Sequence, residues 1–256
     1  MHKNFSFRTL SEYYISPGIK CKFDILKEHL GSRKKFEKGI DLGCSGNSFL
    51  YFLDNVVHKS FFDIASLPLV QYFKIQSKES NVKKYKCFLH PLCGDLTKMP
   101  YREETFDFVS ALDVLEHIKD DNLAVSEISR ILKRNGIAII VVPHIMRYYN
   151  RQDKLIGHYR RYEFEHIVSL FDSFNLKCLQ SFGIYGSLMK ISCIQISNPK
   201  KIETSIIDLR NRYESNPVFR KLWNAVVVVC SKAMKIDAKL QPTKRIRNIG
   251  LLFVKK

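Results

Sequence analysis

The chain has 256 residues, enough for one α/β domain with a large core and too few for two comfortable ones. It has no stretch of 18 uninterrupted apolar residues, and its first residues lack the apolar run of a secretory signal, which argues against a membrane-spanning helix and against export. Seven scattered cysteines favour reduced thiols. We therefore expect a single cytoplasmic domain.

The net charge of +17 is concentrated outside the central part of the chain. Residues 141–256 hold 21 Lys and Arg against eight Asp and Glu, whereas residues 41–140 hold 12 against 13. A basic surface suits an anionic partner such as RNA, a phosphorylated lipid or a membrane face. The alternative is that the charge serves solubility alone.

The first predicted elements belong to an N-terminal helical extension, residues 1–35. Within it, residues 19–30 have helical spacing of apolar side chains and end at Gly31. An alternation of apolar strands with polar turns and amphipathic helices follows. The candidate strands are residues 39–42, 60–64, 86–92, 106–111 and 136–143.

A helix with both ends marked is expected between the last two of these strands. It begins at the capping residues Asp120 and Asp121 and stops at Asn135 and Gly136. Its spacing places five apolar side chains on one face: Leu123, Ala124, Ile128, Ile131 and Leu132.

The C-terminal part is expected to add a helix at residues 162–174 and a strand at 175–186. Residues 199–216 are charged and are expected to be irregular, whereas residues 217–236 form a strongly apolar helix candidate with Pro217 at its start. The final strand is expected at 245–256. Residues 185–245 then make a helical insertion before that strand, within one domain over residues 1–256.

Short apolar strands that alternate with helices imply a doubly wound parallel sheet buried on both faces. Ligands of such sheets gather outside the carboxyl ends of the strands. Four acids stand there: Asp41, Asp63, Asp95 and Asp113. A lone Asp at a strand end is commonly a cap or a turn residue, so the argument depends on the four occurring in order.

The turn after the first strand does not favour a nicotinamide cofactor. Such a turn carries glycine at its first, third and sixth places, which here hold Gly43, Ser45 and Ser48. An acid directly before the turn, Asp41, better suits a cofactor that presents a positive charge or an amine to this loop. Asp63 follows 22 residues later, about where an acid binds a ribose.

Six motifs in this order make the chain resemble the class I S-adenosylmethionine-dependent methyltransferases, especially small-substrate enzymes of the UbiE and UbiG type (the methyltransferase type 11 group). The motifs are DLGC, FFDIA, GDLTKMPYREETFDFV, DVLEHI, ILKRNG and GHYRRY, and the resemblance covers roughly residues 36–180. It implies an α/β fold with a doubly wound, mostly parallel seven-stranded sheet and an antiparallel last strand. It also implies S-adenosyl-L-methionine as cofactor.

The resemblance assigns the cofactor-binding residues. The loop Asp41, Gly43, Cys44, Ser45, Gly46 and Asn47 would pass the methionine part, and Asp63, followed by Ile64, would accept the ribose hydroxyls. Asp95 with Leu96 would hold the adenine edge, and Asp113 would lie beside the methionine moiety. The family usually continues the loop with two further glycines where this chain has Ser45, Gly46 and Asn47. Serine is small and asparagine tolerates positive φ, so we expect the loop to remain competent.

Two histidines are candidates for the general base that a hydroxyl acceptor needs. His117 follows the fourth strand end, and His158 lies in the loop after the fifth strand. In the same loop Tyr159, Arg160 and Arg161 are candidates for binding the acceptor, because arginines pair with carboxylate or phosphate. The alternatives are packing or capping for the histidines and a solvated basic face for the loop.

No metal site is expected. Cys87, His90 and Cys93 have a suggestive spacing, but no second pair of ligands is nearby and the run lies on a predicted strand. The apolar helix at 217–236 could contact a membrane peripherally and present a lipid-linked acceptor. The alternative is that it packs internally or on a partner subunit.

These observations favour methyl transfer to an oxygen, or less readily a nitrogen or carbon, of an anionic or lipid-linked small molecule. An RNA acceptor ranks behind, because interleaved aromatic and basic residues occur mainly in MRYYNR and HYRRY. A non-catalytic binding module of the same fold is the alternative from another class, suggested by Ser45 and Asn47. A nicotinamide oxidoreductase comes third.

Overall fold

The computed structural model describes residues 8–31, 35–79, 87–188, 199–242 and 245–256. Seven strands form one sheet in the order β3-β2-β1-β4-β5-β7-β6. Their bounds are β1 Phe36–Leu42, β2 Val56–Asp63, β3 Phe88–Cys93, β4 Phe106–Leu112, β5 Leu132–Pro143, β6 Leu176–Tyr185 and β7 Asn248–Lys255. The first five strands run parallel, and β7 lies antiparallel to both β5 and β6. The expected α/β fold with an antiparallel last strand is confirmed.

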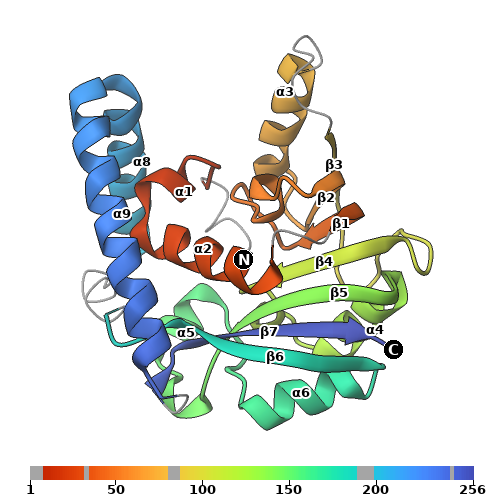
Figure 1. Ribbon diagram of the computed structural model, residues 1–256. Helices are drawn as coiled ribbons and strands as arrows, with labels where there is room; N and C mark the ends of the chain where they lie inside the picture. Colours follow the sequence, from red (N-terminus) through yellow and green to blue (C-terminus); the bar gives the residue numbers. More distant parts are fainter. Residues whose placement is uncertain (1–7, 32–34, 80–86, 189–198, 243–244) are drawn as a thin grey trace.

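Helices cover both faces of the sheet (Figure 1). They are α1 Glu12–Ile15, α2 Pro17–Leu30, α3 Val70–Glu79, α4 Asp121–Ile131, α5 Arg151–Ile156, α6 Phe164–Asp172, α8 Pro199–Ser215 and α9 Pro217–Leu240. Helices α4 and α6 bury their apolar sides in one core cluster, and α2 and α3 bury theirs in the other. Short 3₁₀ turns lie at Leu50–Phe52, Leu67–Leu69, Leu115–His117 and Met146–Tyr148.

The helix between β4 and β5 is shorter than expected. Helix α4 ends at Ile131, and β5 begins at Leu132, which pairs with Phe106 of β4. The stop expected at Asn135 and Gly136 is therefore wrong, because strand pairing takes over the last predicted helical turn. Leu123 was also misplaced: it is 51% exposed, and Val125 is buried instead.

The segment expected to be irregular at residues 199–216 is the helix α8. Lysine, glutamate and arginine are good helix formers, so a charged composition does not argue against a helix. The half-buried residues Ile206, Arg210 and Tyr213 recur at helical spacing, and α8 packs beside α9. A polar helix supported by a neighbour along its length explains the error.

Helix α9 covers the region that was predicted as an apolar helix and extends four residues further, to Leu240. Asn216 caps it by accepting hydrogen bonds from the backbone N–H groups of Val218 and Phe219. It packs along α2, with Val227 and Ala238 buried. The other predictions for the C-terminal part agree with α6, β6 and β7 to within a few residues.

Candidate functional site

The carboxyl ends of β1, β2, β3 and β4 meet at one edge of the sheet, which we call the cofactor edge. In the parallel register Leu42 pairs with Phe62 and Ala111, and Asp63 pairs with Cys93. The acids Asp41, Asp63, Asp95 and Asp113 therefore stand at or just beyond this edge. The topology brings together residues that are more than 70 positions apart in the sequence.

The turn after β1 is tied to the end of β2. The N–H groups of Gly43 and Cys44 donate to the carbonyl oxygen of Phe62, at 2.8 and 3.3 Å. The N–H of Ser45 donates to Oδ2 of Asp63 at 2.8 Å, and the N–H of Ala65 donates to Oδ1 of the same carboxylate. Asp63 thus holds the loop in place and keeps further acceptor capacity on both oxygens, as a ribose-binding acid requires.

Two loop positions have left-handed backbone conformations. Gly43 has φ +65°, and a Cβ atom there would lie 2.4 Å from Cγ2 of Val114. Ser45 has φ +48°, where the family usually places a glycine. A left-handed non-glycine residue costs about 1–2 kcal/mol, so the serine is accommodated at an energetic penalty. The loop keeps its glycine-type shape despite the altered sequence.

Asp41 does not point out into the crevice. Its side chain is buried and accepts hydrogen bonds from the hydroxyl groups of Ser48 and Ser110. Burial raises the pKa of its carboxyl to about 6, although both serine hydrogen bonds act to lower it. Asp41 therefore stabilises the loop by hydrogen bonds from the buried side. Its direct contact with the cofactor stays a prediction.

The N-terminal segment covers the far side of the loop. A Cβ atom on Gly46 would lie 1.8 Å from the backbone oxygen of Arg8, so only glycine fits against this segment. Gln71 of α3 ties both parts together by donating to the carbonyl oxygen of Gly46 and accepting from the N–H of Leu10. Next to it, the buried Oδ1 of Asn47 has no hydrogen-bond partner among the described residues. A donor group of a ligand would satisfy this atom.

The third acid is the most exposed of the four. Oδ1 of Asp95 accepts from both the N–H and the hydroxyl of Thr97, which lowers the pKa of its carboxyl. Leu96 is buried in the core, whereas Ile64 is 51% exposed at the end of β2. Of these three residues, Ile64 and Asp95 offer side chains at this end of the edge, and Leu96 offers its backbone.

Asp113 directly follows β4 and contacts side chains from two distant segments of the chain. It has φ +54°, and its carboxylate accepts from Nζ of Lys22 at 2.7 Å and from Nδ2 of Asn248 at 2.8 Å. Burial acts to raise the pKa of Asp113, but the charge and hydrogen bond of Lys22 outweigh it, so the net pKa is lowered. Lys22 comes from α2, which brings the N-terminal extension into the site.

Beyond Asp113, the structure brings both predicted histidines together. The rings of His117 and His158 meet edge to face, with centroids 4.6 Å apart. Close to both lies Glu116, which is fully buried. Neither of its oxygens has a hydrogen-bond partner among the described residues, and Nε2 of His158 lies 3.7 Å from Oε1. Burial, followed by the charge of Asp113, raises the pKa of Glu116 well above its ordinary value.

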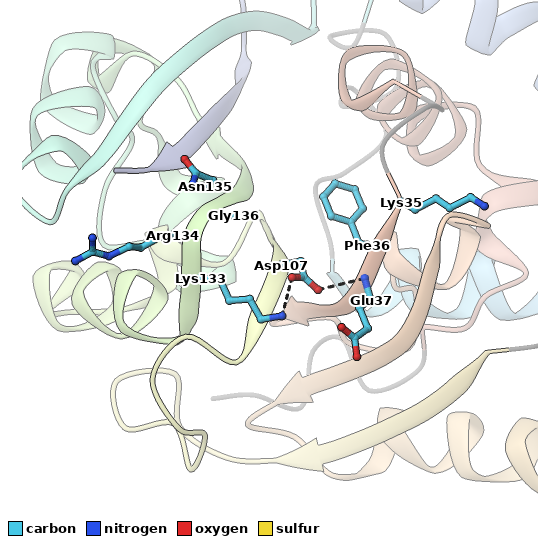
Figure 2. A pocket seen from close by; sticks show the side chains of 8 residues that line it. All are labelled: Lys35, Phe36, Glu37, Asp107, Lys133, Arg134, Asn135 and Gly136. Carbon is cyan, nitrogen blue, oxygen red and sulfur yellow. Dashed lines mark hydrogen bonds and ion pairs between the residues drawn. The ribbon is translucent and has the colours of Figure 1, made fainter.

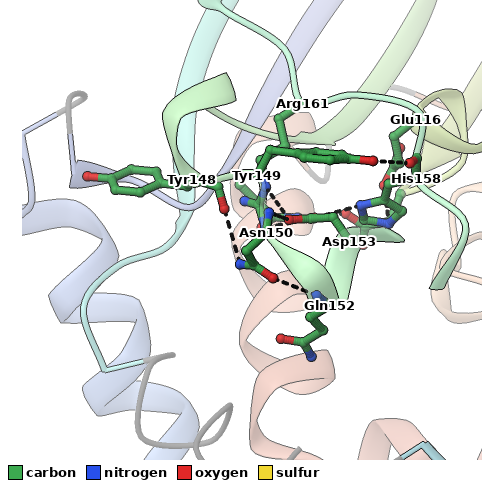
Figure 3. A network of polar contacts seen from close by, with 10 residues as sticks. Glu116, Tyr148, Tyr149, Asn150, Gln152, Asp153, His158 and Arg161 are labelled. Carbon is green, nitrogen blue, oxygen red and sulfur yellow. Dashed lines mark hydrogen bonds and ion pairs between the residues drawn. The ribbon is translucent and has the colours of Figure 1, made fainter. Parts of the chain in front are cut away.

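Asp153 orients His158 and the loop that carries it (Figure 3). Its Oδ1 lies 2.9 Å from Nδ1 of His158, and Arg161 forms two contacts with the same carboxylate, at 2.9 and 3.0 Å. The N–H of Asn150 also donates to Asp153 at the start of α5. These bonds leave Nε2 as the nitrogen of His158 that faces Glu116.

The three residues predicted to bind the acceptor differ in their partners and in their exposure. Arg161 is bound by Asp153, and Arg160 forms an ion pair with Asp121 and donates to the carbonyl oxygen of Lys119. Tyr159 is 52% exposed. Both arginines thus have partners within the chain, and their role in acceptor binding stays a prediction.

A separate cavity of about 260 Å³ lies at the opposite, amino end of the strands (Figure 2). Its lining includes the ion pair between Lys133 and Asp107, and Asp107 also accepts from the N–H groups of Glu37 and Lys38. Since ligands of doubly wound sheets bind at the carboxyl ends, this cavity is not the cofactor site.

Comparison with known proteins agrees with this geometry. Residues 40–140 match the family described as "Methyltransferase domain". The matched part of the chain is therefore similar to a methyltransferase domain. The matched residues include the cofactor edge, from the loop after β1 to β5, and the family's cofactor, S-adenosyl-L-methionine, fits the glycine turn and the carboxylates that line it.

The curated relatives are matched over less than half of their lengths. An uncharacterized protein of Methanocaldococcus jannaschii is 33% identical over 114 residues, which are 43% of this chain and 44% of the relative. The human mitochondrial arginine-hydroxylase NDUFAF5 is 30% identical over 129 residues, which are 46% of this chain and 34% of the relative. The chain thus spans less than half the length of these relatives.

Solved structures resemble the chain as a fold. Phosphoethanolamine N-methyltransferase 2 of Haemonchus contortus, in complex with S-adenosyl-L-methionine, superposes with a TM-score of 0.60 at 16% identity. The match covers 98% of this chain and 56% of that one. At this identity the likeness shows the fold alone.

Several residues of the site were not predicted from the sequence. Lys22 could have been found as a lysine within the apolar face of its helix, and Glu116 as the carboxylate next to His117. Asp153 follows the capping residue Asn150 by three positions, which indicates a helix start only. Tyr72, whose hydroxyl bonds to the backbone of Ser45 and Ser48, carries no signal in the sequence.

The suggestive run of Cys87, His90 and Cys93 makes no joint site among the described residues. Cys93 is exposed and its thiol contacts the carbonyl oxygen of Ile64. His90 instead lies beside His58 of β2, with Nε2 and Nδ1 3.2 Å apart at the exposed edge of the sheet.

Proposed function

We propose that the protein is an S-adenosylmethionine-dependent methyltransferase that acts on an oxygen of an anionic or lipid-linked small molecule. The observation that carries the proposal is the bond between the loop and the second acid: Asp63 accepts from the N–H of Ser45 and retains acceptor capacity toward a ribose. A glycine turn and a ribose acid built as one unit are what the nucleoside part of the cofactor needs.

In the proposed complex, Asp63 binds the ribose hydroxyls, the Asp95 and Leu96 turn binds the adenine edge, and Asp113 lies beside the methionine part. The sulfonium supplies the methyl group to the acceptor. The chain's own residues align the two reactants and exclude water, which is most of what an in-line displacement requires.

The acceptor is proposed to bind where Asp113 adjoins His117 and His158. A hydroxyl acceptor loses its proton as the oxygen–methyl bond forms, the sulfur–methyl bond breaks and sulfur keeps the electron pair. His158 is oriented by Asp153, the arrangement that suits a proton acceptor. Oxygen is therefore favoured over nitrogen and carbon as the methylated atom.

Helix α9 supports the lipid-linked version of the proposal. Its surface carries an apolar stripe at helical spacing, with exposed fractions from 59 to 78%: Val218, Leu222, Val229, Ile236 and Leu240. Lys221 and Lys232 accompany the stripe, whereas Lys235 and Lys239 form ion pairs with Glu28 of α2. An apolar stripe among cations suits the surface of an anionic membrane. No helix within the described residues is long and apolar enough to cross one.

Two alternative functions remain to be tested against this proposal. A non-catalytic binding module is suggested by Ser45 and Asn47 in the loop, and an RNA acceptor is suggested by the basic C-terminal part. In addition, one relative is named an arginine-hydroxylase, so the fold by itself does not imply methyl transfer.

Calorimetric titration of the full chain with S-adenosyl-L-methionine tests the cofactor. No heat up to about millimolar cofactor, well above the affinity range of functional sites, would favour the binding module. Incubation with cofactor labelled in its methyl group, first with lipid and metabolite extracts and then with RNA, identifies the acceptor by mass spectrometry. Label that enters RNA alone would overturn the small-molecule proposal.

Liposome flotation tests the contact of α9 with a membrane. Truncation before Pro217 is unsuitable, because it would remove β7 from between β5 and β6. The triple variant Val218→Ser, Leu222→Ser, Val229→Ser should float less with anionic vesicles than the unaltered chain. The control Leu67→Ser, Phe73→Ser, which alters exposed apolar residues elsewhere, should float equally well. Equal flotation of all three proteins contradicts the proposal.

A further inference from the structure

We propose that Glu116, His117 and His158 bind a divalent transition-metal ion. One ligand atom from each of these residues lies within 4.8 Å of the others, on two segments that meet beyond the end of β4. Two imidazoles and one carboxylate form the ligand set of open, catalytic metal sites, which leave positions for substrate oxygen. Zn²⁺, Mn²⁺, Fe²⁺ and Co²⁺ are the ions that such a set prefers.

The carboxylate of Glu116 is an independent indication of a ligand. It is fully buried, and neither oxygen has a hydrogen-bond partner among the described residues. Buried polar atoms without partners are rare and costly, at about 1–3 kcal/mol each, so such atoms mark a missing partner. The carboxylate faces Nε2 of His158 at 3.7 Å, about the separation of two ligands on one ion.

The residues behind the ligands are arranged as in metal sites. Nδ1 of His158 bonds to the carboxylate of Asp153, which frees Nε2 for the ion. A carboxylate behind a ligating histidine is the usual outer support of such a ligand. Arg161 in turn holds Asp153 by two bonds, so the orientation of His158 is fixed before any ion arrives.

The balance of charge also favours a cation. Three carboxylates converge here, and Lys22 neutralises Asp113 while Arg161 neutralises Asp153. Among the described residues Glu116 has no lysine or arginine within ion-pair distance. A divalent ion would supply the missing positive charge where burial makes an unpaired carboxylate costly.

The catalytic use of the ion rests on the proposed function, whereas its binding does not. An acceptor hydroxyl that binds an open position of the ion releases its proton to water more readily, since a metal lowers the pKa of a bound hydroxyl group. The oxygen then takes the methyl group, and sulfur keeps the electron pair of the broken bond. In this version the two histidines act as ligands rather than as the base.

Titration with Co²⁺, followed by its visible absorption, tests the site. The exposed pair of His58 and His90 is a second place where a metal could bind, so the test uses the variant His58→Asn, His90→Asn as its background. That background should bind one Co²⁺, and Zn²⁺ should raise its melting temperature. Failure of this background to bind either ion overturns the proposal.

Glu116→Gln and His158→Asn, each added to the background, should weaken Co²⁺ binding by more than tenfold and abolish the Zn²⁺-induced rise in melting temperature. Asp153→Asn should weaken it by about 10- to 100-fold, the range known for outer supports of metal ligands. Unchanged Co²⁺ affinity in Glu116→Gln or in His158→Asn refutes the assignment. Circular dichroism confirms that each variant is folded.

Titration of the same variants with S-adenosyl-L-methionine separates this inference from the proposed function. Glu116→Gln should bind the cofactor as the background does, because Glu116 lies beyond Asp113 from the cofactor loop. A chain that binds Co²⁺ but no cofactor would refute the proposed function and leave the metal site standing. A chain that binds cofactor but no metal would refute the metal site alone.

Discussion

The cofactor loop, residues 43–48, and the acceptor cluster, Glu116 with His117 and His158, differ in how their polar groups are satisfied. In the loop, backbone donors bond to Phe62 and Asp63, and the serine hydroxyl of residue 48 bonds to Asp41. In the acceptor cluster, Glu116 is buried with both oxygens unpaired among the described residues. Apart from the buried Oδ1 of Asn47, the loop is held by bonds within the chain, whereas the carboxylate of Glu116 in the acceptor cluster lacks a partner among the described residues.

This difference separates residues that shape a site from residues that bind. Asp41 has the sequence signature of a cofactor contact, yet its bonds to two serines make it part of the scaffold. Glu116 has no such signature, yet its buried oxygens mark a place for a ligand. Variants of the loop and of the acids beside it test this difference.

Gly43→Ala should lower the free energy of unfolding by about 2–4 kcal/mol, since a left-handed alanine costs about 1 and the overlap with Val114 costs about 1–3. Urea denaturation followed by circular dichroism measures it. Gly157→Ala is the matched control: Gly157 is also left-handed, but a Cβ there meets nothing nearer than 3.8 Å, so its loss should be about 1 kcal/mol. Equal losses would show that the loop tolerates movement of Val114.

Asp41→Asn should make the protein more stable relative to the unaltered chain as the pH rises. The pKa of Asp41 is raised to about 6 in the folded state by burial, so the folded state binds more protons than the unfolded state, and stability from this group falls between about pH 4 and pH 6. Asparagine removes that loss.

The gain of Asp41→Asn should grow by about 2 kcal/mol between about pH 4.5 and pH 7.5, from the shift of roughly two pKa units. Urea denaturation at several pH values checks it. A gain that does not depend on pH would mean that Asp41 titrates normally and is not enclosed by the two serines.

Asp63→Ala should weaken binding of S-adenosyl-L-methionine by about 1–3 kcal/mol, as expected for a lost charge-assisted hydrogen bond, measured by calorimetric titration. The control is Asp172→Ala, an exposed aspartate of α6 outside the cofactor edge, which should leave the affinity unchanged. Unchanged affinity in Asp63→Ala would refute the ribose role and leave Asp63 as a brace of the loop.

Ser45→Gly should stabilise the protein by at most about 1 kcal/mol, because glycine adopts φ +48° without the penalty that serine bears. Thermal and urea denaturation measure this, and cofactor titration shows whether the loop binds more tightly. A loss of stability would indicate that contacts of the serine side chain outweigh the backbone strain. Ser66→Gly, outside the loop and at an αR position, should instead be destabilising.

Much of the fold follows from local patterns in the sequence. Apolar strands that alternate with helices predicted the doubly wound sheet, and an acid before a glycine turn predicted the position of the cofactor loop. The apolar run from Pro217 predicted a helix. The charged residues of α8 form a helix rather than the expected irregular segment, because α9 supports that helix through a tertiary contact that composition does not show.

The site could be predicted only in part. The sequence named His117 and His158 separately, but their distance of 41 positions gave no sign that they share one cluster. Lys22 and Asp113 are 91 positions apart and meet at 2.7 Å only because α2 packs over the end of β4. Glu116 and Asp153 were missed for the same reason.

The sequence by itself determined the order of strands and helices, the left-handed turn at Gly43 and the acids at the strand ends, because these depend on side-chain periodicity and backbone sterics within a few residues. The tertiary structure alone decided which of those acids are buried and how each is paired, and it left Glu116 without a partner among the described residues. Burial and pairing depend on atoms brought in from distant segments, and they set the electrostatic free energy of each carboxylate.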